Sequence, residues 1–142
     1  MNKNIVLVLS LALIAIVMAS AVSADENVTI DGIDFNIPDG YTEDVDAQIV
    51  NETDTDEGMT YISNAKAYES EDNYMLLLVA AYEGVNASED AFADIEGDNL
   101  TINGVDGKLV DMYIMSIYCY VKDGKLVTLT SDISDEFEKF IV

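Results

Sequence analysis

The chain has 142 residues, of which 28 are acidic and six are lysine, and with no histidine or arginine its net charge at pH 7 is −22. This charge repels phosphate backbones and anionic lipid headgroups, and no guanidinium group is present to clamp a phosphate, so nucleic-acid binding is not expected. Histidine, the commonest general base and a frequent zinc ligand, is missing, and no glycine-rich phosphate loop occurs. We therefore predict a protein that is not an enzyme and has no cofactor.

The first 24 residues have the pattern of a secretory signal peptide. Lys3 forms a short basic start, residues 5–18 are apolar except for one serine, and small residues follow up to Ala24. We predict cleavage after Ala24 and a secreted or cell-surface location. An uncleaved membrane anchor stays open as an alternative, because residues 5–22 are just long enough to span a bilayer, and the membrane would then be contacted through this segment alone.

Residues 25–142 are expected to form one extracytoplasmic domain. Cleavage would remove Lys3 and change the net charge from −22 to −23. The single cysteine, Cys119, has no partner for an internal disulfide, so the domain must be held by its core alone. Cys119 alternates in register with apolar neighbours, which predicts a small buried core residue and not a nucleophile.

The first strand is predicted over residues 27–37, with a bend or bulge at Asp31-Gly32 and an end at Pro38-Asp39-Gly40. Residues 41–58 are mostly polar, and we expect a short strand over 47–50 followed by a loop over 51–58.

Two strands come next. Residues 59–68 have one modestly apolar face, whereas residues 74–82 are almost wholly apolar and are predicted to be a central strand that is buried on both faces. Residues 69–73 are predicted to connect them as a hairpin loop.

Residues 88–96 predict an internal helix. Ser88 can cap it, two acidic residues lie in its first turn, and Gly97 suits the position after its end.

The last third of the chain predicts strands and a terminal helix. Asn103-Gly104 suits a tight hairpin turn, with Asp106-Gly107 as a competing site, and residues 109–122 are predicted to be the longest strand. Asp123-Gly124 turns the chain into a strand over 126–130. A helix from Asp135 is predicted from apolar residues with helical spacing, namely Ile133, Phe137, Phe140 and Ile141.

This order of elements predicts an α+β fold: an antiparallel sheet of about five to six strands on which an internal helix and a C-terminal helix pack. The sequence Ile-Asp-Phe-Asn-Ile-Pro-Asp-Gly-Tyr at residues 33–41, the hairpin at 121–126 and the terminal helix resemble small exported proteins of methanogenic archaea. The order of elements is also similar to that of the PsbP-like α/β/α sandwich. The resemblance covers residues 28–142, rests on turn residues and patterning, and implies a fold and a compartment but no functional residue.

Four sequons make this a candidate glycoprotein. Each has the pattern N-x-[ST], and the asparagines are Asn27, Asn51, Asn86 and Asn99. Their alternative role is that of turn asparagines beside capping serines or threonines.

Alternating acids at Glu52, Asp54 and Asp56 resemble the start of a calcium-binding loop. However, the glycine falls one position late and no acid lies at the twelfth position, so a solvated acidic loop is favoured and a weak cation site is the alternative. Tyrosines on the predicted strands, Tyr113, Tyr118 and Tyr120 among them, could stack sugars or dock peptides. Cross-strand packing under a helix is the favoured interpretation.

The sequence therefore predicts a small exported binding or interaction module with a protein or glycan partner at the cell surface. The alternative is a cation-binding or structural protein of the cell envelope that uses its acidic surface.

Overall fold

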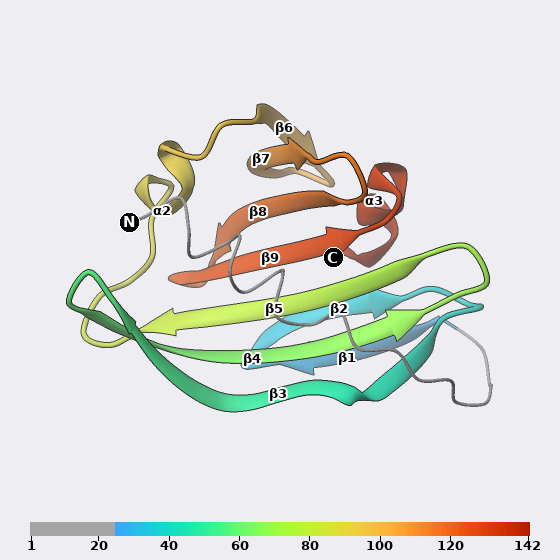
Figure 1. Cartoon of the computed structure of the whole chain (residues 1–142), viewed down its shortest axis with the longest axis horizontal. Coiled ribbons are helices and arrows are strands. Elements are labelled where there is room, and N and C mark those ends of the chain that lie inside the picture. Colours follow the sequence, from blue (N-terminus) through green and yellow to red (C-terminus); the bar gives the residue numbers. More distant parts are fainter. Residues whose placement is uncertain (1–24) are drawn as a thin grey trace.

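The computed structural model describes residues 25–142, and these form a seven-stranded antiparallel sheet with a separate two-stranded hairpin (Figure 1). The order in the large sheet is β3-β4-β5-β9-β8-β7-β6. Its strands are β3 (Thr42–Asp56), β4 (Met59–Glu69), β5 (Tyr74–Tyr82), β6 (Asp98–Ile102), β7 (Val105–Asp111), β8 (Ser116–Lys122) and β9 (Lys125–Ser131). The hairpin consists of β1 (Glu26–Ile30) and β2 (Ile33–Ile37). The predicted export segment, residues 1–24, lies outside the described part of the chain.

The predicted α+β class is wrong, because the structure is 61% strand and 9% helix. The internal helix expected over residues 88–96 is a single turn, α2 (Asp90–Ala93), whose N-cap residue is Glu89 and not the predicted Ser88, and Glu89 makes no side-chain capping hydrogen bond. The terminal helix is a 3₁₀ turn, η1 (Ser134–Glu136), continued by α3 (Phe137–Phe140). Helices this short gain little from backbone hydrogen bonds, so the sheet and not helical cover dominates. Within residues 25–142, no helix has the length and apolar character that crossing a membrane requires.

The predicted strand number is also wrong, because the long strand expected over 109–122 is two strands. β7 and β8 pair antiparallel from Asp111↔Ser116 onward, and residues 112–115 connect them. The connection is closed by a hydrogen bond from the Met112 N–H to the Met115 carbonyl at 2.8 Å. Met112-Tyr113-Ile114-Met115 contains no glycine, proline, asparagine or aspartate, so it carries none of the residues by which turns are predicted.

Residues 51–56, predicted as a loop, continue β3 as far as Asp56. They pair in register with β4 from Glu52↔Ser63 to Asp56↔Met59, and Glu57-Gly58 forms the two-residue turn with φ values of 49° and 82°. Pairing with β4 outweighs the low strand propensity of the acidic residues. Their charge also protects an edge strand from pairing with another chain.

The Asn-Gly and Asp-Gly turns behave as their chemistry predicts. Asn103-Gly104 and Asp123-Gly124 each close a hairpin with positive φ at both residues. Asp31-Gly32, predicted as a bend or bulge, closes the β1–β2 hairpin in the same way, with Ile30 opposite Ile33. The central strand is confirmed: β5 lies between β4 and β9, and both of its faces are buried.

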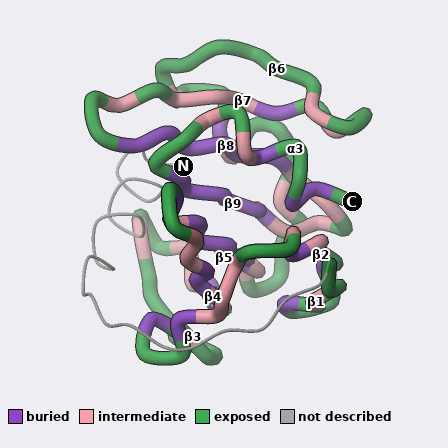
Figure 2. Tube along the Cα trace, turned by 90° about the vertical axis from the view of Figure 1, so that its right-hand side faces the viewer, coloured by how far each residue is buried: buried purple, intermediate pink, exposed green. Residues whose placement is uncertain are grey.

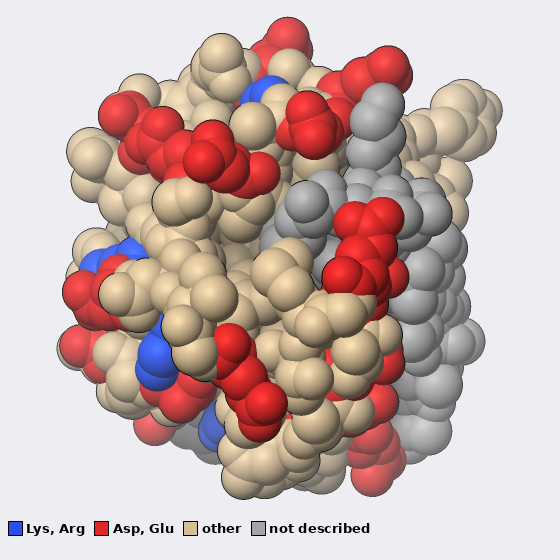
Figure 3. Space-filling view, turned by 90° about the vertical axis from the view of Figure 1, so that its left-hand side faces the viewer, with Lys and Arg blue, Asp and Glu red and all other residues tan. Residues whose placement is uncertain are grey.

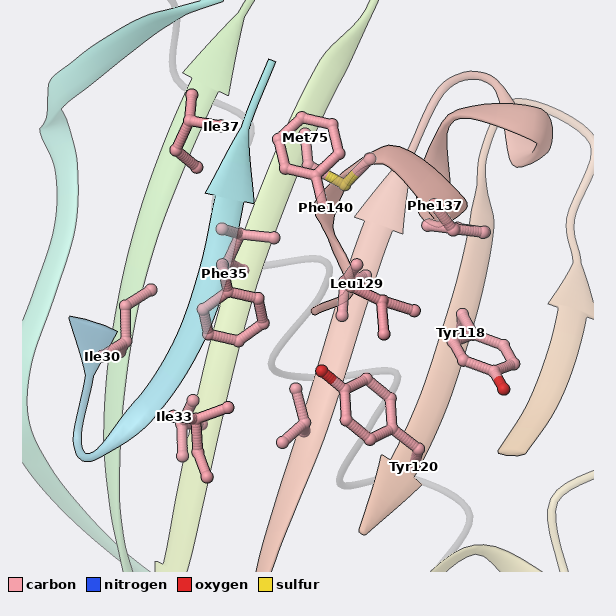
Figure 4. Close-up of a cluster of buried hydrophobic side chains, with 14 of the residues drawn as sticks. Ile30, Ile33, Phe35, Ile37, Met75, Tyr118, Tyr120, Leu129, Phe137 and Phe140 are labelled. Carbon is pink, nitrogen blue, oxygen red and sulfur yellow. The ribbon is translucent and has the colours of Figure 1, made fainter. Parts of the chain in front are cut away.

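One face of the sheet, here called the covered face, is packed under the β1–β2 hairpin and α3 (Figure 2). Phe35 of β2 is fully buried and bridges Ile141, which follows α3. Tyr118 packs against Phe137, with ring centroids 6.0 Å apart (Figure 4). The packing interpretation is therefore confirmed for Tyr118 and Tyr120, which are buried in this cluster, and is wrong for Tyr113, which is fully exposed.

Gly107 on β7 gives a testable property of this face. A Cβ atom at this position would lie 2.4 Å from the Cys119 carbonyl oxygen and 2.6 Å from Cζ of Tyr118. We expect Gly107→Ala to lower the free energy of unfolding by about 1–3 kcal/mol, because the added methyl group overpacks this site. Gly104→Ala is the comparison for backbone strain alone, because nothing lies within 4 Å there and its φ is 78°. Urea unfolding measures both losses, and a loss below about 0.5 kcal/mol for Gly107→Ala would contradict the packing.

Candidate functional site

The opposite face of the sheet has a different lining, and we call it the small-residue face. Three rows of directly paired residues run across β4, β5, β9 and β8. The rows are Ala67–Leu76–Thr130–Ile117, Ala65–Leu78–Thr128–Cys119 and Ser63–Ala80–Leu126–Val121. Each row begins with alanine or serine on β4, so this part of the sheet is lined by short side chains close to the backbone.

The described cover over the small-residue face is sparse. The off-sheet apolar side chains that pack with it belong to residues 87–95, which contain α2, and to Met112. Residues 87–95 begin shortly after the end of β5 and lie at one end of the sheet (Figure 1). The covered face, by contrast, has a hairpin and a terminal helix across it. The two faces of one sheet are therefore built for different contacts.

Buried polar atoms without a partner gather on or beside this face. Among residues 25–142, the buried side-chain atoms that have no hydrogen-bond partner are Asp44 Oδ2, Asp56 Oδ2, Ser63 Oγ and the Tyr74 hydroxyl. Ser63 is part of the third row, and Tyr74 packs against the same cluster. Leaving a buried polar group unpaired costs about 1–3 kcal/mol, so each such group in a native structure calls for a physical explanation.

Tyrosines at the two ends of the face are held neutral. Burial, followed by the charge of Asp54 and a hydrogen bond to it, raises the pKa of Tyr61 to about 12. Burial, followed by the charge of Asp44, raises the pKa of Tyr74 to about 12. The negative charges at both ends disfavour an anionic ligand and favour a cationic one.

The acidic residues predicted as a weak cation site, Glu52, Asp54 and Asp56, lie on one strand and not in a loop. They point to the same face, opposite Ser63, Tyr61 and Met59. Alternate residues of a strand are about 6.6 Å apart, which is too far for three carboxylates to converge on one ion. In the described residues, no group of three or more acidic or cysteine side chains is placed to hold a metal.

The four predicted glycosylation sites are exposed. Asn51 lies on β3 and Asn99 on β6, which are the two edge strands of the large sheet, while Asn27 lies on β1 and Asn86 follows β5. Exposure satisfies the physical condition for a glycan at all four. Asn86 also lines a shallow hollow of about 190 Å³ between α2 and the end of β5. Figure 3 looks onto this end of the molecule, where acidic side chains are widespread and lysines are few.

Cys119 lies in the second row and is fully buried. Burial raises the pKa of its thiol to about 12 against a weaker opposing hydrogen bond with Thr128, so little thiolate exists at neutral pH. We expect the folded protein to resist a thiol-reactive dye at pH 8 and to react stoichiometrically once it is unfolded in guanidinium. Complete labelling of the folded protein, as fast as the dye labels a free thiol, would contradict the burial of the Cys119 thiol.

Sequence reasoning found the acidic residues, the sequons and Cys119, but it missed the small-residue face. That face is assembled from four strands, and its alternation is hidden within the nearly continuous apolar run of β5. Asp44 was missed because it precedes the short strand predicted over residues 47–50, in a stretch that is mostly polar and shows no pattern of burial. The one local clue is the run of small residues at alternate positions on β4, Ser63, Ala65 and Ala67.

No protein-family model, curated protein or solved structure matches this chain. The resemblance to exported proteins of methanogenic archaea therefore stays a prediction.

Proposed function

We propose that the chain is an exported, non-enzymatic binding module, secreted or at the cell surface, and that the small-residue face is its ligand-binding surface. The observation that carries this proposal is the difference between the two faces of the sheet. The covered face is filled by large side chains under two elements. The other face combines short side chains on β4 with leucines and Ile117 on β5, β9 and β8, and it holds unpartnered buried polar atoms.

The lining favours an extended, mainly apolar ligand. Alanines at Ala65, Ala67 and Ala80 would let such a ligand lie close to the sheet, and each Å² of apolar surface removed from water contributes about 25 cal/mol. The hydroxyl of Ser63 and the carboxylate of Asp44 would then fix its orientation. Apolar pockets with a few convergent polar groups are the usual form of a small-molecule site.

The proposal can be tested on protein that is expressed with its own export segment and purified in the form that the host cell exports. Nile red, a neutral apolar dye, should bind and brighten. Ala65→Leu should abolish most of this binding by filling the second row. Ala81→Leu, which adds the same side chain on the opposite face of β5, should retain it.

Melting curves show whether each variant is folded. Thr128→Leu fills the same row from β9 and replaces Ala65→Leu if that variant unfolds. Equal dye binding by the filled variants and Ala81→Leu would overturn the assignment of the ligand to this face.

The alternative is a cation-binding or structural envelope protein that uses its acidic surface collectively, and the row of Glu52, Asp54 and Asp56 on β3 is part of that surface. A rise of several degrees in melting temperature with sub-millimolar calcium, lost when Asp54 and Asp56 are replaced by asparagine, would favour it. If the row is merely solvated, neither calcium nor the double substitution should change the melting temperature.

The proposed location has its own test. Cell fractionation with intact mass measurement should recover residues 25–142 outside the cytoplasm, with added glycan mass if Asn27, Asn51, Asn86 or Asn99 is modified. Recovery of the uncleaved chain among cytosolic proteins would contradict export.

A further inference from the structure

A buried carboxylate lies at one end of the small-residue face. Asp44 is 5% exposed, and its Oδ1 accepts a hydrogen bond from the Asp46 N–H at 3.1 Å. Its Oδ2 is buried and has no hydrogen-bond partner among residues 25–142. Asp44 is paired with Ala67, the first residue of the first row, so its side chain belongs to the same face.

Tyr74 adds a second unpartnered group at the same end. Its hydroxyl is buried without a partner among the described residues, and its side chain packs on the small-residue face. Burial is the main cause that raises the pKa of Tyr74, and among the charges that raise it further Asp44 has the largest effect, followed by Glu69 and Asp132. β3 and β5 are separated only by β4, a distance of about 10 Å that a tyrosine side chain largely bridges.

The described lysines are all engaged elsewhere. Three form ion pairs, namely Lys66 with Glu43, Lys125 with Asp31 and Lys139 with Glu136. The other two donate to backbone carbonyls, Lys108 to Ala93 and Lys122 to Val142. With no arginine or histidine in the sequence, no cation of residues 25–142 neutralises Asp44. A buried unpaired carboxylate is costly, and a ligand cation would remove that cost.

We propose that Asp44 and Tyr74 form a subsite for the ammonium group of an apolar amine, whose hydrocarbon part lies along the row Ala67–Leu76–Thr130–Ile117. This inference rests on the proposed function and names the ligand class of the same face. An ammonium group has three N–H donors, which can be shared between the carboxylate Oδ2 and the Tyr74 hydroxyl oxygen. The acidic residues Glu69 and Asp132 attract the cation toward this end.

An organic ammonium fits this subsite better than a metal ion. Calcium requires six to eight oxygen ligands, and the described part of the chain offers no cluster of three or more acidic side chains for one. The adjoining row is apolar apart from Thr130. An apolar row suits a hydrocarbon and offers few ligands to a hydrated ion.

The test compares ligands of one length and different charge on the protein as exported. Octylammonium, octanol and octanoate are titrated by calorimetry, below their aggregation concentrations, against wild type, Asp44→Asn and Asp46→Asn. We expect octylammonium to bind wild type at least tenfold more tightly than octanol, with octanoate weakest. Asp44→Asn, which keeps the side-chain shape, should bring octylammonium to the affinity of octanol, whereas Asp46→Asn should leave the difference intact.

The outcomes separate the two proposals. Equal binding of octanol and octylammonium to wild type, or an unchanged ratio in Asp44→Asn, overturns the ammonium subsite while the apolar face stands. Displacement of octylammonium by millimolar calcium but not by equal ionic strength of sodium chloride would show that Asp44 is a metal ligand and would overturn it as well. If none of the three ligands binds to a folded wild type, the proposed function fails along with it. Tyr74→Phe, which removes the hydroxyl alone, should weaken octylammonium and not octanol.

Discussion

Replacing Phe35 by alanine is expected to lower the free energy of unfolding by about 3–5 kcal/mol, the range found for phenylalanines in packed cores. Phe35 is fully buried on β2, and its backbone bridges Ile141 at the far end of the chain. The ring therefore packs the N-terminal hairpin and the C-terminal segment against the same sheet (Figure 4). The neighbouring side chains cannot easily move into the cavity that the substitution leaves, because strands fix their positions on both sides.

The comparison is Tyr113→Ala, which removes an aromatic ring of similar size from the loop between β7 and β8. Tyr113 is fully exposed, so its loss should change stability by less than about 0.5 kcal/mol. Urea unfolding followed by far-ultraviolet circular dichroism measures both variants. A loss below about 1 kcal/mol for Phe35→Ala would mean that the β1–β2 hairpin is not an integral part of the core.

Alkaline pH is expected to unfold the protein steeply above about pH 10, because buried tyrosines must ionise. Burial raises the pKa of Tyr118 to about 12 from the ordinary value of 10.0. Burial likewise raises the pKa of Tyr68 and of Tyr120. All three belong to the cluster on the covered face.

The direction follows from the number of bound protons. Above pH 10 the unfolded chain loses the phenolic protons of these residues while the folded chain keeps them, so the folded state binds more protons. Their stabilising contribution is complete below pH 10 and is lost as the pH rises toward the raised pKa values. Each tyrosine contributes about 1.4 kcal/mol per pH unit, so the three together remove about 4 kcal/mol per pH unit.

Tyrosinate absorbance and circular dichroism, recorded together between pH 9 and pH 12, test this expectation. Ionisation of the buried tyrosines should coincide with loss of the sheet. Tyr120→Phe should move the midpoint to higher pH, whereas Tyr113→Phe, which alters an exposed ring, should leave it in place. Full tyrosinate absorbance at pH 10.5 with an unchanged circular dichroism spectrum would contradict the burial of these hydroxyls.

Local chemistry predicted part of the fold. Asn103-Gly104 and Asp123-Gly124 specify their turns through residues that tolerate positive φ, and the apolar run of β5 specifies a central strand. The predicted helices are longer than the observed ones, because helical spacing over a few residues does not show whether tertiary packing will extend a helix. The turn at residues 112–115 was missed because it contains no turn-forming residue and is held by the pairing of β7 with β8.

The candidate site was less predictable than the fold. Asp44 gives no local pattern, since its burial depends on the register of β3 against β4, which is irregular immediately after it. The alternation of Glu52, Asp54 and Asp56 resembles a calcium-binding loop in the sequence, yet in the structure it reflects a strand with one acidic face. The small residues of β4 can be recognised as part of a continuous face only when their pairing partners on β5, β9 and β8 are known.

The central claim, that the ligand lies on the small-residue face, is tested most directly by methyl NMR spectra of the exported protein titrated with octylammonium. We predict that the methyl signals of Ala65, Ala67 and Leu76 shift progressively and saturate, while those of Ile33 and Leu129 on the covered face stay in place. Shifts confined to the covered face, or no shifts at a concentration at which calorimetry detects binding, would contradict the account.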